Sequence, residues 1–188
     1  MIRNILKLST VSIMMLSCTT TTHQYIIDIP TSKTSSKQAQ KLYTRVAISA
    51  VKLPSYLLEH KIAKRGEGSS IEYLDTHKWA EKLDVAFKRE MQSYLQKHLV
   101  GVEMVEYPWG TMAQRVVEFQ IHQFIAQDKS IALDATLKVF YRKTNQTKRY
   151  ALKSSQGFSG KDEDIAGAMN AVFEEVLHKI GNILSKKN

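Results

Sequence analysis

The strongest constraint on the fold is the alternation of side chains along residues 130–142. One face would carry Ile131, Leu133, Ala135, Leu137, Val139 and Tyr141, and the other Ala132, Asp134, Thr136, Lys138, Phe140 and Arg142. Because successive side chains of a strand point to opposite faces of a sheet, this pattern is typical of a half-buried antiparallel strand. Residues 115–126 and 148–156 form similar strands, and the short links 127–129 and 143–147 connect all three. The sequence therefore predicts a three-stranded antiparallel meander.

Shorter strand patterns precede the meander. They cover residues 25–29, 44–53, 62–65, 71–74 and 102–107. Both faces of residues 44–53 are small or apolar, which indicates a central position in the sheet. Gly66 and Gly68 allow the positive φ angles of a hairpin turn between 62–65 and 71–74.

Two amphipathic helices complete the predicted elements. The first is expected over residues 75–100, with an apolar stripe at three- and four-residue steps that includes Trp79. The second is expected over residues 162–184, with Ser159 or Asp162 as its capping residue. Together the elements predict an α+β fold, a two-layer sandwich of a largely antiparallel β-sheet with two amphipathic helices on one face.

The first 17 residues have the composition of an export signal. Arg3 and Lys7 precede the apolar run 8–16, which is too short to cross a bilayer. Cys18, the only cysteine, follows the small residue Ser17. A cysteine at this position is what lipoprotein processing requires, because signal peptidase cuts before it and its thiol carries the diacylglycerol. The alternative is an incidental thiol in an ordinary secreted protein.

We therefore expect a lipoprotein signal peptide at residues 1–17, a lipid-anchored tether at 18–24 and a single domain at 25–188. Loss of Arg3 and Lys7 lowers the formal net charge from +9 to +7. This balance suits an anionic membrane surface or an acidic partner. The cations are spread along the sequence, so nucleic acid is not expected as a partner.

No residue pattern points to catalysis, to a metal or to another cofactor. The six histidines lack the spacing of a zinc motif: His23, His60, His77, His98, His122 and His178. Gly157-Phe158-Ser159-Gly160 lacks the G-x-S-x-G spacing of a serine nucleophile. We therefore expect a protein that is not an enzyme and that has no cofactor.

Two apolar segments outside regular elements suggest a binding surface. Leu53, Pro54, Tyr56 and Leu57 lie in the first segment, and Tyr107 and Trp109 in the second. Each segment is either folded back onto the core or exposed for contact with a partner or with lipid. The basic turn between Arg142 and Arg149 is either a solvated turn or a contact for lipid headgroups.

Several short motifs follow one another in an order that resembles a known family. They are the cysteine of the lipobox, Tyr25-Ile26-Ile27, Val51-Lys52-Leu53-Pro54-Ser55-Tyr56-Leu57, Ile62…Arg65, Trp79-Ala80-Glu81-Lys82-Leu83, Tyr107-Pro108-Trp109, a strand of the Val116…Phe124 type, and Ala168-Met169. Their order and spacing, over about residues 25–184, resemble the family of paraquat-inducible protein C, the ABC-type transport auxiliary lipoproteins. The main departure is Met15-Leu16, where a leucine followed by a small residue is usual.

The resemblance implies a periplasmic lipoprotein on the outer membrane, acting as a non-catalytic accessory component of an intermembrane lipid transport system. Its partner would be a mammalian-cell-entry (MCE) domain protein that forms a tunnel for lipids such as phospholipid, and the auxiliary lipoprotein would form a homo-oligomeric ring at the end of that tunnel. Thr19, in place of an aspartate after Cys18, agrees with outer-membrane sorting. The alternatives are an envelope structural or assembly lipoprotein that binds another outer-membrane protein, and a periplasmic hydrolase.

Overall fold

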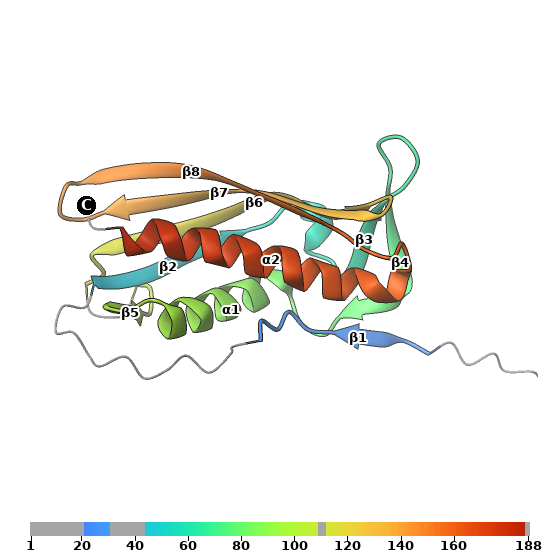
Figure 1. Ribbon diagram of the computed structural model, residues 1–188, viewed down its shortest axis with the longest axis horizontal. Helices are drawn as coiled ribbons and strands as arrows, with labels where there is room; N and C mark the ends of the chain where they lie inside the picture. Colours follow the sequence, from blue (N-terminus) through green and yellow to red (C-terminus); the bar gives the residue numbers. More distant parts are fainter. Residues whose placement is uncertain (1–20, 31–43, 109–111, 187–188) are drawn as a thin grey trace, which may run out of the picture.

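Figure 1 shows the computed structural model, which describes residues 21–30, 44–108 and 112–186. The strands in this part of the chain are β1 (His23–Tyr25), β2 (Thr44–Lys52), β3 (Lys61–Arg65), β4 (Ile71–Trp79), β5 (Val102–Val105), β6 (Arg115–Gln127), β7 (Ser130–Tyr141) and β8 (Gln146–Gly157). The helices are α1 (Leu83–His98), α2 (Asp162–Ser185) and the short 3₁₀ helix η1 (Ser55–Leu57). All these strands belong to one sheet.

The predicted meander is confirmed as β6, β7 and β8. β6 and β7 pair in an antiparallel ladder from Arg115–Tyr141 to Gln127–Ser130, and β7 and β8 pair along their whole length. The two turns contain Asp128 and Asn145, whose φ angles are 52° and 53°. Short polar side chains tolerate this left-handed backbone, so each turn can be tight.

β6 connects the meander to the remaining strands. Its first half pairs in parallel with β2, from Val46–Arg115 to Lys52–Gln120, and its end pairs with β3 at Lys64–Ala126. β2 lies between β5 and β6, which confirms its predicted central position. The longest ladders are the antiparallel ones of the meander, so the sheet is largely antiparallel.

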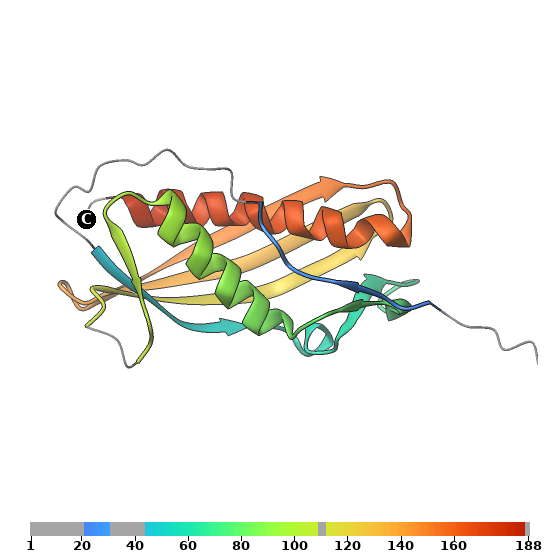
Figure 2. The same ribbon diagram turned by 90° about the horizontal axis from the view of Figure 1, so that it is seen from below.

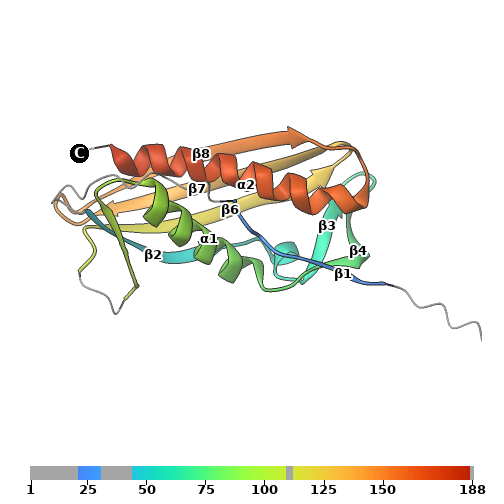
Figure 3. The ribbon, with the colours of Figure 1, turned by 60° about the horizontal axis from the view of Figure 1, so that its bottom comes forward.

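Both long helices lie on the same face of the sheet, as Figures 2 and 3 show. Phe87 of α1 contacts Phe173 of α2 at a ring-centroid distance of 4.6 Å and Phe124 of β6 at 5.6 Å. All three rings are fully buried, so they connect the two helices to the sheet. The predicted α+β fold, with two helices over one sheet face, is confirmed.

The first helix begins at Leu83 and not at Asp75, which corrects the sequence prediction. Residues 71–79 form β4 instead, because they have partners on both sides. The N–H of Trp79 donates to the carbonyl of His60 at 2.6 Å, and Asp75 pairs with Lys61 at 2.9 Å across the hairpin. This non-local pairing outweighs the local helix pattern. Trp79 is buried as predicted, but as a strand residue.

Other element ends also differ from the predictions. β1 ends at Tyr25, so residues 26–30 are not a strand. α2 begins at Asp162, but its N-cap is Lys161, with no side-chain cap. Ser159 instead accepts the N–H of Lys161 at 3.0 Å and donates to the carboxylate of Asp164. The loop expected at residues 31–40 lies outside the described residues.

Candidate functional site

β1 is the first element that follows Cys18 in the sequence. Cys18 itself lies outside the described residues. β1 pairs in parallel with β4, with His23 opposite His77, and the ring of Tyr25 stacks on His77 at a centroid distance of 5.7 Å. Position 23 is five residue steps after position 18, and a fully extended chain covers at most about 18 Å in five steps. Figure 1 shows the β3–β4 hairpin and the start of α2 at this same end, which we call the β1 end.

The two apolar segments predicted from the sequence do not form one surface. Residues 53–58 connect β2 to β3 and lie toward the β1 end. Tyr107 follows β5 near the opposite end, where β2, β6 and β8 begin and α2 ends. We call this the far end. Tyr107 is 48% exposed, and Trp109 lies outside the described residues, so contact of these two residues with a partner stays a prediction.

Much of the first segment belongs to the core. Leu57 is 1% exposed and lies in the core, which agrees with the alternative that this segment folds back onto the core, and its contact with a partner stays a prediction. Leu53 and Tyr56 are partly buried and pack against the core, and Pro54 is half-buried as the N-cap of η1. Leu58, the last residue of the same apolar segment, is exposed at 57%.

Tyr56 fills a gap in the sheet between β2 and β3. β2 pairs with β6 as far as Gln120, and β3 pairs with it at Ala126. Between these points the N–H of Phe124 donates to the Tyr56 hydroxyl at 3.0 Å. Burial raises the pKa of Tyr56. Tyr56 therefore satisfies a backbone donor that would otherwise lie in the gap without a partner.

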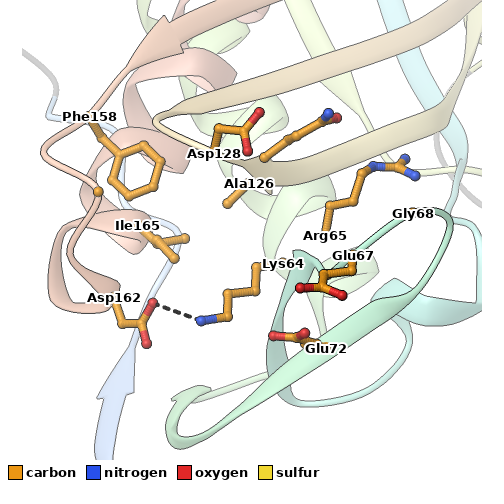
Figure 4. Close-up of a pocket in the computed structure, with 13 residues that line it drawn as sticks. Lys64, Arg65, Glu67, Gly68, Glu72, Ala126, Asp128, Phe158, Asp162 and Ile165 are labelled. Atoms are coloured by element: carbon orange, nitrogen blue, oxygen red, sulfur yellow. Dashed lines mark hydrogen bonds and ion pairs between the residues drawn. The ribbon is translucent and has the colours of Figure 1, made fainter.

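A pocket of about 520 Å³ opens at the β1 end (Figure 4). The charged side chains that line it are Lys64, Arg65, Glu67 and Glu72 from the hairpin, Asp128 from the β6–β7 turn, and Asp162 from the start of α2. Lys64 Nζ lies 3.4 Å from a carboxylate oxygen of Asp162, beside Phe158 and Ile165. The Nε atom of Arg65 is buried and has no hydrogen-bond partner among the described residues.

This pocket can hold a small polar molecule that carries charges of both signs. Its described lining contains acidic and basic side chains and no serine, cysteine or histidine. The pocket was not predicted from the sequence, because its segments are far apart in the chain and meet through non-local contacts such as the pairing of Lys64 with Ala126. The glycine-containing hairpin was recognised as a turn, but no signal in the sequence placed it next to Asp128 or Asp162.

The sheet face opposite the helices carries ion pairs. Glu118 lies 2.7 Å from Lys138 and 2.8 Å from Lys52. The hydrogen bonds from Lys138 and then Lys52 hold the pKa of Glu118 below its ordinary value. Lys153 pairs with Asp134 at 2.8 Å on the same face. Both acids named here, Glu118 and Asp134, are therefore paired with lysines on this face.

The described residues give no sign of a membrane span or a metal centre. None of the described helices is long and apolar enough to cross a bilayer. In the same part of the chain, no group of three or more histidine, cysteine or acidic side chains is placed to hold a metal ion.

Comparisons with known proteins agree on a family and a fold. The family model for the ABC-type transport auxiliary lipoprotein component matches residues 25–181. An uncharacterized protein of known crystal structure is similar, with a TM-score of 0.72 and 13% identity over 88% of this chain and 99% of its own. A protein from Xanthomonas campestris is also similar, with a TM-score of 0.63 and 9% identity over 86% of this chain and 92% of its own. At such low identity these structures show the fold alone. No curated protein matches the chain.

Proposed function

This chain belongs to the family of ABC-type transport auxiliary lipoproteins, and on that basis we propose that it serves an MCE-type intermembrane lipid transport system as a non-catalytic accessory component. In this proposal Cys18 is acylated and holds the protein on the periplasmic face of the outer membrane. Several copies form a ring at the end of an MCE-domain tunnel, through which a lipid such as phospholipid passes. The family match, which covers most of the chain, is the observation that carries the proposal.

The position of β1 supports the anchoring part of the proposal. The two or three acyl chains of a mature lipoprotein give a lasting anchor, because each buried methylene contributes about 0.8 kcal/mol. The tether of residues 18–24 then holds the start of β1 within about 18 Å of the membrane surface. No protein segment has to enter the bilayer.

The chemistry of the described side chains supports an accessory role. The described lining of the pocket at the β1 end holds no serine, cysteine or histidine, and Ser159 is engaged by Lys161 and Asp164. An accessory protein acts through binding surfaces and needs no nucleophile, which agrees with the hydrogen bonds that engage Ser159.

Fractionation and co-purification of the full chain test the proposal. We expect the wild type to reach the outer-membrane fraction and to co-purify with the MCE-domain protein, and Cys18→Ala to leave that fraction. Ser17→Ala is the matched control, because it keeps a small residue before the cut and should fractionate like the wild type. If another outer-membrane protein co-purifies and the MCE-domain protein does not, the assembly-lipoprotein alternative is correct.

A further inference from the structure

The far end of the fold gathers positive charge from distant parts of the sequence. Six cations lie there: Arg45, Arg115, Arg142, Lys143, Lys148 and Arg149. The acids in the adjoining part of the chain are Glu103 and Glu106. At the β1 end the charges are nearly even, because residues 61–79, 128–129 and 161–164 together hold seven acids and six cations. Excess positive charge is therefore concentrated at the far end.

Strand register places these cations together. Val46 pairs with Arg115, Arg115 with Tyr141, and Tyr141 with Gln146. The starts of β2, β6 and β8 and the end of β7 are thus aligned in one row across the sheet. Each strand carries its cations at or beside this row, so the cluster follows from the topology.

Carbonyl groups, and not carboxylates, hold two of these cations in place. Arg115 donates to the carbonyls of Leu184 and Lys186 at the end of α2, and Arg142 donates to the carbonyl of Ala113 at 2.9 Å. These contacts fix the guanidinium groups without cancelling their charge. Arg45 is paired with Glu103 at 3.2 Å, so part of the charge at this end is balanced.

The β7–β8 turn and the first residues of β8 present further cations to solvent. Lys143 and Arg149 are exposed, and among the described residues no carboxylate pairs with either. Lys148 Nζ lies 5.3 Å from the centroid of the Tyr141 ring. The positive φ of Asn145 defines a tight turn that holds these side chains at the end of the sheet.

Exposed apolar side chains lie in the same part of the fold. Val100 and Tyr107 flank β5 and are 57% and 48% exposed, and Met112, shortly before β6, is 68% exposed. Large apolar side chains near a charged rim are typical of protein interfaces. A partner that fits this end would therefore present apolar contacts surrounded by acidic side chains.

The position of this end favours a protein partner over the anchoring membrane. α2 runs from the β1 end to the far end (Figure 1), and its 24 residues span about 36 Å. That length is about twice the reach of the tether. A molecule lying flat on its membrane would present a long side, such as the sheet face where Glu118 pairs with Lys52 and Lys138, and not the far end.

We propose that the far end is a docking surface for an acidic protein surface, with Lys143 and Arg149 among its contacts. This inference rests on the proposed function, in which the partner is the MCE-domain protein, and it adds the part of the chain that meets that partner. Electrostatic complementarity of this kind accelerates association and makes it sensitive to salt.

A pair of charge-reversal variants tests the proposal. Lys143→Glu with Arg149→Glu reverses two cations at the far end, and Lys129→Glu with Lys161→Glu reverses two exposed cations at the β1 end. Both variants change the net charge equally. Binding of the full lipidated chain to the purified MCE-domain protein is measured between about 50 and 300 mM NaCl. We expect the far-end variant to bind at least about ten-fold more weakly and the β1-end variant to bind like the wild type.

Each other outcome has a separate meaning. If the wild type binds and both variants weaken equally, or neither weakens, docking at the far end is wrong and the proposed function stands. If the wild type does not bind the MCE-domain protein at all, the proposed function fails and this inference fails with it. Flotation with phosphatidylglycerol vesicles is the third measurement. If the far-end variant loses only vesicle binding, this end meets lipid and the proposal is overturned.

Discussion

Tyr56 lies in a segment that suggested a binding surface, but its side chain packs against the core and supports the sheet. Its sequence context, an aromatic beside a proline outside any regular element, suggested contact with a partner. In the structure its hydroxyl accepts the N–H of Phe124, in a gap that exists only because β2 and β3 pair with different parts of β6. The gap between β2 and β3 along β6 could not be predicted from the sequence, so the structural role of Tyr56 could not be predicted either.

Replacing Tyr56 by Phe removes this hydroxyl and keeps the ring. We expect Tyr56→Phe to lower the free energy of unfolding by about 1 kcal/mol, because the N–H of Phe124 loses its partner. Urea denaturation of the mature domain measures the effect. Tyr73→Phe is the control, since the Tyr73 hydroxyl donates to the Tyr56 carbonyl over a longer 3.4 Å at the surface. Equal losses for the two variants would contradict the structural role of Tyr56.

Glu118 predicts a pH dependence of stability. Lys138 and Lys52 lower its pKa in the folded state, so its contribution is present above the unfolded value of about 4.3 and is lost as the pH falls through the lower folded pKa. We expect Glu118→Gln to lower the free energy of unfolding by up to about 1 kcal/mol at neutral pH, because the site is partly exposed. Denaturant midpoints of the wild type and the variant should converge as the pH falls through the lowered pKa of Glu118. A difference that is unchanged at low pH would refute this assignment.

At the scale of whole elements, the sequence was informative where the pattern was local and long. The alternation of residues 130–142 predicted β7, and short links predicted its neighbours in the meander. The parallel pairings of β1 with β4 and of β2 with β6 were not predicted, because their partners lie far apart in the chain. The strand at residues 71–74 was predicted, but residues 75–79 of β4 were assigned to a helix, because their pairing with β1 could not be identified from the sequence.

The true start of α1 leads to a prediction at this scale. Its N-cap, Lys82, has the extended backbone of a capping residue but no side-chain cap. We expect Lys82→Ser to raise the free energy of unfolding by about 0.5–1 kcal/mol, because a serine hydroxyl can accept a free N–H of the first turn. Thermal unfolding measures the gain, and Lys78→Ser within β4 is the control. Stabilisation by Lys78→Ser and not by Lys82→Ser would mean that the helix begins earlier.

At the scale of the whole molecule, the fold places the clustered cations and the start of β1 at opposite ends. The cations seemed evenly spread along the chain, yet the register through Val46, Arg115 and Tyr141 gathers several of them at the far end. The start of β1, and with it the reach of Cys18, lies at the opposite end. The net charge follows from the composition. The distribution of the cations over the fold and the pocket at the β1 end depend on the topology. A proposed attachment at the β1 end and a cluster of cations at the far end agree with the proposal that the protein is a tethered docking module.

The most direct test of this account is the intact mass of the protein isolated from its native membranes. We predict a chain that begins at Cys18 and carries the added mass of two or three acyl chains, recovered in the outer-membrane fraction. Cys18→Ala should lack this mass. An intact leader peptide, or a mature chain whose Cys18 is unmodified, would contradict the claim that this protein works as a lipid-anchored module.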